Sequence, residues 1–222
     1  MTTPRLRVQP PDPSSPPPAA LPLDRARRWL SPFEAPSSPA PAVTVFLAQK
    51  AYSEAVSHAA SELDIEVGGV LVGEWHPLAE AGRLFIQAEN ALPARFTRQG
   101  NVFLTFTQDS LVDLHNAMDE QFPGKQIVGW YHTHPRMGVF LSHYDTWLHR
   151  YFFPEPWQVA LVIEPYANLG GFFVRQADGS LDPSRYTGFY ELDGNSDRSI
   201  VHWHNLQSEL DVIKPEGDET NE

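Results

Sequence analysis

One stretch in the second half of the chain, Gly129 to Asp145, constrains the fold and the chemistry more than any other. It reads GWYHTHPRMGVFLSHYD. It contains His132, His134, Ser142 and Asp145, which form the pattern H-x-H, seven further residues, and S-x-x-D. Two imidazoles and a carboxylate are suited to binding zinc, and a catalytic zinc site keeps its fourth position for water. The stretch therefore predicts a metal centre.

The local structure of this stretch follows from its apolar pattern. Residues 126–132 are mostly apolar and predict a strand, from which His132 and His134 project to the same side because side chains alternate. Ser142 lies three residues before Asp145, which is the spacing of a capping box at the start of a helix. Such a helix start holds the carboxylate in place facing the histidines. An H-x-H pair alone is usually an ordinary pair of histidines, so the specificity lies in the whole pattern.

A second segment completes a resemblance to a known family. Residues 66–74 read EVGGVLVGE and match the element E-x-x-G-x-x-x-G, which begins with Glu66. Together with the H-x-H and S-x-x-D residues, this segment resembles the JAMM (MPN-plus; JAB, Mov34/PAD-1) motif of zinc metalloisopeptidases. The segments WYHTHP and LSHYD are similar to the deubiquitinating subunit of the proteasome lid and its prokaryotic relatives. The resemblance covers roughly Val43 to Arg175, which is most of the part of the chain that is expected to be ordered.

The resemblance implies a fold and a set of residue roles. The fold is α/β, a single MPN (JAB) domain with a curved mixed sheet flanked by helices in a cytidine-deaminase-like sandwich. His132, His134 and Asp145 are the implied ligands of a Zn²⁺ ion, which lowers the pKa of a bound water towards about 7 and polarises the scissile carbonyl. Glu66 is the implied general base that later protonates the leaving amine. Ser142 is placed to donate a hydrogen bond to the developing oxyanion.

The implied function is that of a zinc-dependent isopeptidase or peptidase. It hydrolyses the bond after the C-terminal glycine of a ubiquitin or ubiquitin-like modifier, in deconjugation or in precursor maturation. One alternative is a non-catalytic MPN scaffold, against which the presence of all five site residues counts. Another is a small-substrate zinc hydrolase that acts on a sulfur-carrier-type protein. The expected partner is a ubiquitin-like protein or its conjugates.

The tail of such a modifier reaches the zinc in an extended form. Extended chains are commonly bound by adding a strand to an exposed sheet edge, and two segments flank the metal, Asn90 to Phe103 and Met137 to Leu141. Met137 and Phe140 lie where related isopeptidases place bulky side chains beside the tail. Gly138 would allow the backbone of the tail to come close. The alternative is that Met137 and Phe140 pack beneath the loop. The predicted substrate-binding residues are Met137, Gly138, Phe140 and Phe103.

The chain of 222 residues allows one domain with tails. Residues 1–42 hold 12 of the 21 prolines and predict a disordered arm. Within the arm, Leu23 to Leu30 is either a short basic turn that docks on the domain or a partner, or part of the linker. The JAMM/MPN domain is expected over residues 43–206, followed by an acidic, solvated tail over 207–222. The arm is expected to be dispensable for fold, zinc binding and hydrolysis.

Periodicity predicts the remaining elements. Strands are expected over 43–47, 67–72, 83–87, 102–106, 126–132, 157–163, 171–175, 186–192 and 200–203, and helices over 49–63, 109–122 and 142–153. Residues 90–101 are expected to form a loop. A second H-x-H pair, His202 and His204, has no acid or cysteine at a useful spacing after it and is interpreted as structural.

Composition excludes several classes of function. The chain has no cysteine, which excludes disulfides and thiol catalysis. Its formal charge of −12 argues against binding to nucleic acid phosphates. There is no secretory signal and no stretch of about 18 apolar residues, so no membrane association and a cytoplasmic location are expected. The sequence does not specify the oligomeric state.

Overall fold

The computed structural model describes residues 16–79, 82–94, 98–100, 103–105, 108–192 and 198–209. The strands of its main sheet are β1 (Ala26–Leu30), β2 (Val43–Ala48), β3 (Gly68–Pro77), β4 (Leu84–Pro93), β7 (Gln126–Thr133), β8 (Val159–Glu164), β9 (Leu169–Phe173), β10 (Phe189–Leu192) and β11 (Gln207–Ser208). In the described part of the chain these nine strands lie in the order β11-β1-β10-β2-β4-β3-β7-β8-β9. Two short strands, β5 (Arg98–Gly100) and β6 (Phe103–Thr105), pair separately.

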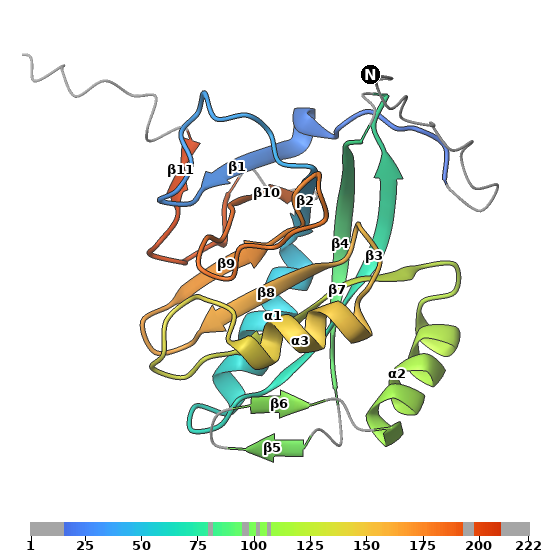
Figure 1. The fold of residues 1–222 in the computed structure, drawn as a ribbon, viewed down its shortest axis with the longest axis vertical. Coiled ribbons are helices and arrows are strands. Elements are labelled where there is room, and N and C mark those ends of the chain that lie inside the picture. Colours follow the sequence, from blue (N-terminus) through green and yellow to red (C-terminus); the bar gives the residue numbers. More distant parts are fainter. Residues whose placement is uncertain are drawn as a thin grey trace, which may run out of the picture.

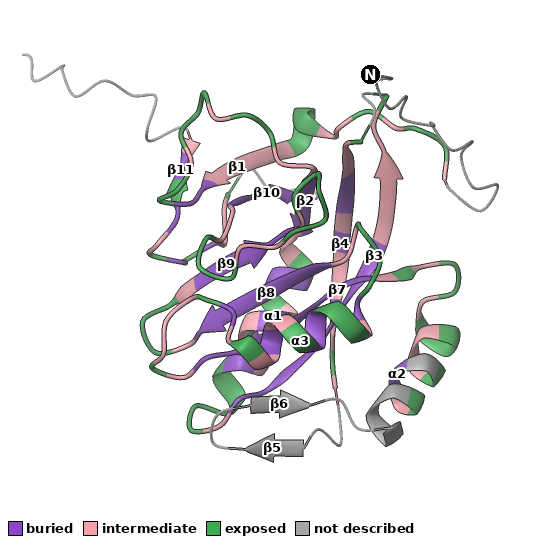
Figure 2. Ribbon diagram, viewed as in Figure 1, coloured by how far each residue is buried: buried purple, intermediate pink, exposed green. Residues whose placement is uncertain are grey.

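The sheet is mixed and strongly curled. Strands β3 and β4 stand nearly upright in Figure 1, whereas β8 and β9 run across the view. Helix α1 (Gln49–Ser61) covers one face, and α2 (Gln108–Gln121) and α3 (His143–Phe152) lie on the other. Each face has its own buried cluster, one with the alanines of α1 and one with Leu148 of α3. Figure 2 shows the central strands buried between these layers. The predicted α/β class with a curved mixed sheet flanked by helices is therefore confirmed.

Strand β7 runs through the middle of this arrangement and brings the Gly129–Asp145 stretch into the core. It pairs antiparallel with β3 and parallel with β8, so His132 lies opposite Gly68 on one side and Val162 on the other. Gly129 permits close packing, because a Cβ atom there would lie 2.4 Å from the carbonyl oxygen of Val159. The end of β7 is thereby fixed from both sides.

The prediction that residues 1–42 form a disordered arm is wrong for residues 26–30. These residues form β1, which pairs antiparallel with β10 and β11. Leu30 is buried, and the indole N–H of Trp29 donates to the Glu191 carboxylate at 3.0 Å. The open edge of β10 supplies backbone partners that the proline-rich composition does not reveal. The docking of this segment, one of the two alternatives left by the sequence, is what the structure shows.

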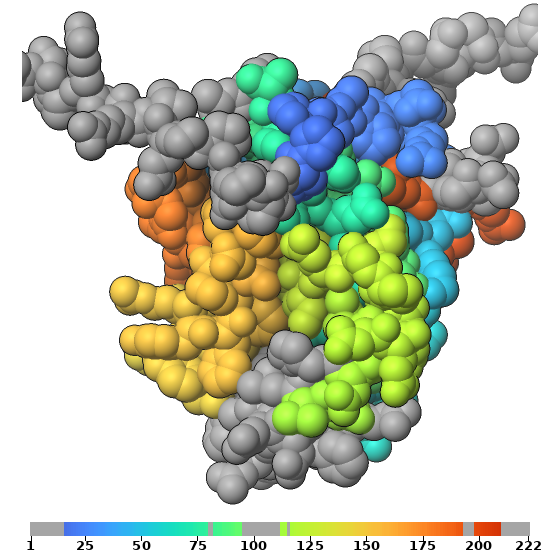
Figure 3. All heavy atoms as spheres, turned by 90° about the vertical axis from the view of Figure 1, so that its right-hand side faces the viewer, coloured from blue at the N-terminus to red at the C-terminus, as the bar shows by residue number. Residues whose placement is uncertain are grey.

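The segment before β1 also lies on the domain. The Ala19 N–H donates to the carbonyl of Pro77 at 3.2 Å, and Leu21 packs in a small cluster around Phe46. In Figure 3 the dark-blue N-terminal segment lies against teal-green atoms of the β3–β4 region. Residues 1–15 lie outside the described part of the chain. The ordered domain therefore begins well before Val43.

Three other expectations need correction. β4 continues to Pro93 and β5 begins at Arg98, so residues 90–101 are not simply a loop; pairing of β4 with β3 as far as Gly69 overrides the polar composition. Residues 200–203 form no strand, although Val201 and Trp203 are buried against α1. The tail predicted from residue 207 begins instead with β11, because Gln207 and Ser208 pair with β1. Residues 210–222 lie outside the described part.

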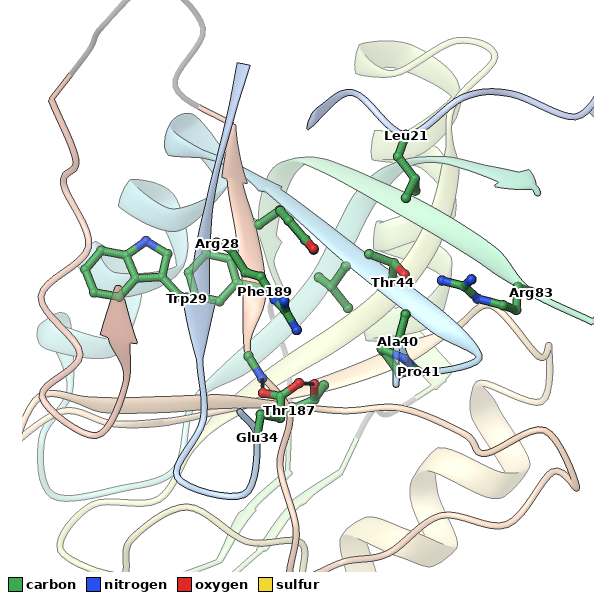
Figure 4. A pocket seen from close by; sticks show the side chains of 13 residues that line it. Leu21, Arg28, Trp29, Glu34, Ala40, Pro41, Thr44, Arg83, Thr187 and Phe189 are labelled. Atoms are coloured by element: carbon green, nitrogen blue, oxygen red, sulfur yellow. Dashed lines mark hydrogen bonds between the residues drawn. The ribbon is translucent and has the colours of Figure 1, made fainter. Parts of the chain in front are cut away.

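A small cavity lies between the 31–42 connection and the sheet (Figure 4). It holds about 40 Å³ of space accessible to water and is lined by Arg28, Glu34, Thr44 and Arg83, among others. Glu34 accepts bonds from the N–H groups of Ser31 and Gly188, which ties the connection to β10. None of the lining residues comes from the Gly129–Asp145 stretch, so the cavity is separate from the predicted metal centre.

In the described part of the chain, no helix has both the length and the apolar character that crossing a membrane requires.

Deleting residues 1–30 should destabilise the domain strongly, because it removes β1 and the buried side chain of Leu30. Burial of one such side chain contributes about 1.5–3 kcal/mol, and the β1 ladder adds to it. We expect a loss of at least about 3 kcal/mol in the free energy of unfolding, measured by urea denaturation. Deletion of residues 1–15 is the control and should change little. Equal stability of both deletions would contradict the assignment of β1.

Candidate metal centre

Two histidines meet at the end of β7. His132 is the next to last residue of the strand, and the N–H of His134 donates to the Ile163 carbonyl at 2.9 Å, which extends the pairing with β8. Their Nε2 atoms lie 3.0 Å apart, and both side chains are buried. The predicted projection of the two rings to one side is confirmed.

Asp145 reaches the histidines from the first turn of α3. The Ser142 N–H donates to Asp145 Oδ2 at 2.7 Å, and the Asp145 N–H donates to Ser142 Oγ at 3.1 Å. This is the predicted capping box with Asp in place of Glu. Asp145 Oδ1 lies 3.4 Å from His132 Nε2, and Oδ2 lies 3.4 Å from His134 Nε2. The helix cap therefore also aims the carboxylate at both rings.

The three side chains fit a metal ion. Their donor atoms are 3.0–3.4 Å apart at the closest pairs, and a tetrahedral ion with ligands at about 2.0–2.1 Å separates its ligands by about 3.3 Å. All three residues are buried. Among the described residues, they form a group of side chains whose ligand atoms lie close enough together to hold a metal ion. The chain thus supplies three ligands of nitrogen and oxygen type at one buried point.

The pKa shifts of His132 and Asp145 also favour binding of a cation. Burial lowers the pKa of His132, although Asp145 opposes this, and a lowered pKa favours the unprotonated ring that binds metal. Burial alone would raise the pKa of Asp145. The attraction of His132, together with hydrogen bonds involving His132, His134 and Ser142, outweighs burial and lowers that pKa below its usual range. The carboxyl is therefore ionised.

Glu66 joins this group from a distant part of the sequence. It follows α1 and precedes β3, and its carboxylate Oε1 lies 3.9 Å from His134 Nε2 in a buried position. Two hydrogen bonds fix its neighbour to β7: the Val67 N–H donates to Thr133 Oγ1 at 2.9 Å, and the Thr133 N–H donates to the Val67 carbonyl at 2.8 Å. The structure therefore brings together all five predicted residues of the site.

Glu164 is a site-supporting residue that sequence reasoning missed. It ends β8, is buried, and accepts hydrogen bonds from the N–H groups of Arg136, Tyr166 and Ala167 at 2.7–3.0 Å. Arg136 lies in the turn after His134 with a φ of 61°, an unfavourable region for a residue other than glycine. Glu164 thus holds the start of the loop that joins His134 to Ser142. In the sequence, the only sign of this role was that Glu164 is an acidic residue at the end of an otherwise apolar strand.

Three of the four predicted substrate-binding residues lie along this loop. Phe140 is 37% exposed, and its ring centre lies 4.7 Å from that of His134. Gly138 has a φ of 87°, and a Cβ atom added to it would meet nothing within 4 Å, so space is open above it. Met137 is half-buried and belongs to neither large core cluster. The backbone of Phe103 lies in β6, but its side chain is outside the described part.

The proposed edge at Met137 to Leu141 is partly occupied. The Leu141 N–H already donates to the Pro183 carbonyl at 2.8 Å. A strand added by a substrate would therefore use the earlier part of this segment. The second H-x-H pair lies elsewhere: His202 and His204 are exposed, and their backbone N–H groups bond to Tyr52 and Asn168.

The chain resembles a known protein family and two individual proteins. The family model described as "JAB1/Mov34/MPN/PAD-1 ubiquitin protease" matches residues 41–153. The chain is 36% identical over 104 residues to the NAD(+) hydrolase TcpA of Theionarchaea archaeon (strain DG-70-1), a match that covers 46% of this chain and 28% of that protein. The solution structure of protein DSY2949 from Desulfitobacterium hafniense is 22% identical with a TM-score of 0.48, covering 72% of this chain and all of that one.

The purified protein should hold about one divalent metal ion per chain. His132→Ala or Asp145→Ala removes one of three ligands, so each variant should lose most of the bound metal. Metal content is measured by mass spectrometry after gel filtration in chelator-free buffer. The control is His202→Ala, which changes the exposed H-x-H pair and should keep the wild-type content. Equal metal in all four proteins would contradict the assignment.

Proposed function

Because the chain belongs to the JAB1/Mov34/MPN/PAD-1 ubiquitin protease family, we propose that it is a zinc-dependent isopeptidase or peptidase. Its proposed reaction is hydrolysis of the bond after the C-terminal glycine of a ubiquitin-like modifier. The observation that carries this proposal is the convergence of Glu66 with His132, His134 and Asp145 at one buried point. A ligand set complete with a neighbouring carboxylate supports an enzyme rather than a scaffold.

Zinc is the metal that this donor set favours. Two imidazoles and one carboxylate match the three-ligand catalytic sites of zinc hydrolases, which leave a fourth position open. His132, His134 and Asp145 would hold the ion. When bound, it would act as a Lewis acid on the scissile carbonyl and lower the pKa of a coordinated water to about 7.

Glu66 and Ser142 supply the remaining chemistry. Glu66 is a carboxylate beside the ligand set, and it accepts a proton from the attacking water and delivers it to the leaving amine. Ser142 Oγ accepts the Asp145 N–H bond, so its own O–H can donate to the oxygen on which negative charge develops. Asp145 has no part in proton transfer, because its oxygens face the histidines and the Ser142 N–H.

The loop between His134 and Ser142 supports binding of a narrow, extended tail. Phe140 offers an exposed aromatic surface beside His134, and the open space above Gly138 admits a peptide backbone. A modifier that ends in Gly-Gly has no side chains to clash in such a space. These features favour a ubiquitin-like protein, free or conjugated, as the partner.

The relative named as an NAD(+) hydrolase suggests a competing activity. This chain corresponds to 28% of that protein, so its named activity does not have to belong to the shared part. Hydrolysis of a glycosidic bond passes through a cationic sugar, whereas attack on a carbonyl builds negative charge. A metal cation stabilises the second kind of transition state. The proposed centre therefore favours an amide substrate, and NAD⁺ serves as a competing substrate in the test.

Replacing Glu66 with Gln should abolish turnover and preserve the metal. Glutamine keeps the shape of the side chain but cannot accept the proton, and general acid–base catalysis contributes about 10²–10⁴-fold. The substrate is a fluorescent peptide ending in Gly-Gly, joined to the ε-amino group of a lysine. We expect kcat to fall at least about a hundredfold, with metal content and melting temperature unchanged.

The controls separate the alternatives. A sulfur-carrier-type substrate, Gly-Gly joined to the α-amino group of cysteine, and NAD⁺ are tested in parallel with the wild-type protein. Cleavage of NAD⁺ alone would overturn the proposal, and cleavage of the cysteine peptide alone would identify the small-substrate alternative. A metal-loaded wild-type protein that cleaves none of the three substrates would support the scaffold interpretation.

Replacing Phe140 with Ala should weaken substrate binding and leave the chemistry intact. Its ring is exposed beside His134. Removing the ring takes away a contact with the substrate tail that is equally strong in the ground state and in the transition state, and such a loss raises KM without changing kcat. We expect KM to rise several-fold for the Gly-Gly isopeptide substrate, with kcat and metal content unchanged. Phe33→Ala, another aromatic residue that is 44% exposed, is the control and should leave KM unchanged. Loss of folding in Phe140→Ala would instead make it a core residue.

A further inference from the structure

The two histidine ligands lack the usual support for their second ring nitrogen. A metal-binding histidine normally donates its other N–H to a carboxylate, a carbonyl or a water, which fixes the ring orientation. Here the Nδ1 atoms of His132 and His134 are buried and have no hydrogen-bond partner in the described part of the chain. Among the described protein atoms, the contacts that orient these rings are therefore ring packing rather than hydrogen bonds to Nδ1.

Trp130 provides such a contact for His132. It precedes His132 by two residues on β7, so both side chains lie on the same face of the sheet. The indole and imidazole rings are nearly parallel, with centres 4.5 Å apart and an angle of 10°. The indole is also nearly parallel to the ring of Phe153, at 5.7 Å and 8°. Because Trp130 is fully buried, its plane determines the plane available to His132.

A hydrogen bond in turn fixes the indole. Its N–H donates to Nδ1 of His149, 3.0 Å away, and both residues are buried. Burial and the nearby Arg175 lower the pKa of His149 to about 3, so the ring is neutral and Nδ1 can accept. Arg175 also donates to the carbonyl oxygens of Phe153 and His149 at the end of α3, at 2.7 and 3.4 Å. The acceptor is therefore held on a fixed helix end.

His149 and Asp145 lie four residues apart on α3, and both are buried. We propose that the Trp130–His149 pair is a positioning device for His132, so that docking of α3 sets two metal ligands at once. Asp145 is placed directly by the first turn of the helix, and His132 is placed through the indole that His149 holds. This inference rests on the proposed metal centre and assigns a role to two residues outside the ligand set.

The test measures zinc affinity by competition with a chromophoric chelator. His149→Leu removes the acceptor and leaves the indole N–H without it, so we expect zinc binding to weaken about 10–100-fold, as for other residues that orient metal ligands. His149→Gln retains an acceptor oxygen and should remain within a few-fold of wild type. The absorption spectrum of the Co²⁺-substituted protein should change in His149→Leu, because the ligand geometry changes, and not in His149→Gln.

The pair must also behave as a unit. Trp130→Phe keeps an aromatic ring and removes the N–H, so the double variant Trp130→Phe/His149→Leu should lose no more zinc affinity than the worse single variant. Additive losses would show that the two residues act independently and would overturn the proposal. Trp130→Phe also keeps the test decisive if His149→Leu does not fold.

The matched control is His58→Leu. His58 bonds to the hydroxyl of Tyr131 at 2.9 Å, so it supports the neighbouring residue of β7 on the opposite face. Its loss should lower the melting temperature without changing zinc affinity. If His149→Leu also lowers only the melting temperature, His149 is a packing residue and the positioning role is wrong. A wild-type protein that binds no zinc would instead refute the proposed function and this inference with it.

Discussion

The capping box at the start of α3 is the interaction on which the rest of the site depends. Asp145 uses one carboxylate group for two tasks: it caps the helix through the Ser142 N–H, and it faces both histidine rings. Without the hydrogen bond from the Ser142 N–H, the buried carboxylate of Asp145 would lose one of its partners. A buried charge that lacks hydrogen-bond partners is costly in free energy. Because the cap is part of the helix, the position of the carboxylate is decided when α3 docks on the sheet. The packing of α3 thereby sets the geometry of the candidate metal centre.

The other elements bring their residues to this helix start through backbone pairing. β7 lies between β3 and β8, so the register of two ladders fixes how far His132 and His134 extend beyond the sheet. The same ladder, continued by Val67 and Thr133, carries Glu66 to the histidines. Glu164 then ties down the turn that follows His134. Hydrogen bonds of the main chain, which depend on no particular side chain, set most of the geometry.

The far edge of the sheet shows a different balance of forces. Residues 26–30 have no strong strand pattern of their own, and prolines surround them. They form β1 because β10 offers an unpaired edge, because Leu30 becomes buried, and because Trp29 finds an acceptor in Glu191. Glu191 also accepts bonds from Gln49, Ser199 and the Ile200 N–H, which gathers the N-terminal strand, α1 and the C-terminal segment around one buried carboxylate. Composition predicted disorder for this segment and gave no sign of the strand that it pairs with.

The sequence by itself determined the candidate ligands, the capping box and most central strands and helices. Those features depend on residue types at short spacings, such as His132 with His134 and Ser142 with Asp145, and local backbone geometry is enough to relate them. Only the tertiary structure decided that residues 26–30 and 207–208 are strands, that Glu164 holds the metal loop, and that Trp130 and His149 lie behind His132. Each of these depends on contacts between residues far apart in the chain, and periodicity carries no information about which distant edge, carboxylate or ring a segment will meet.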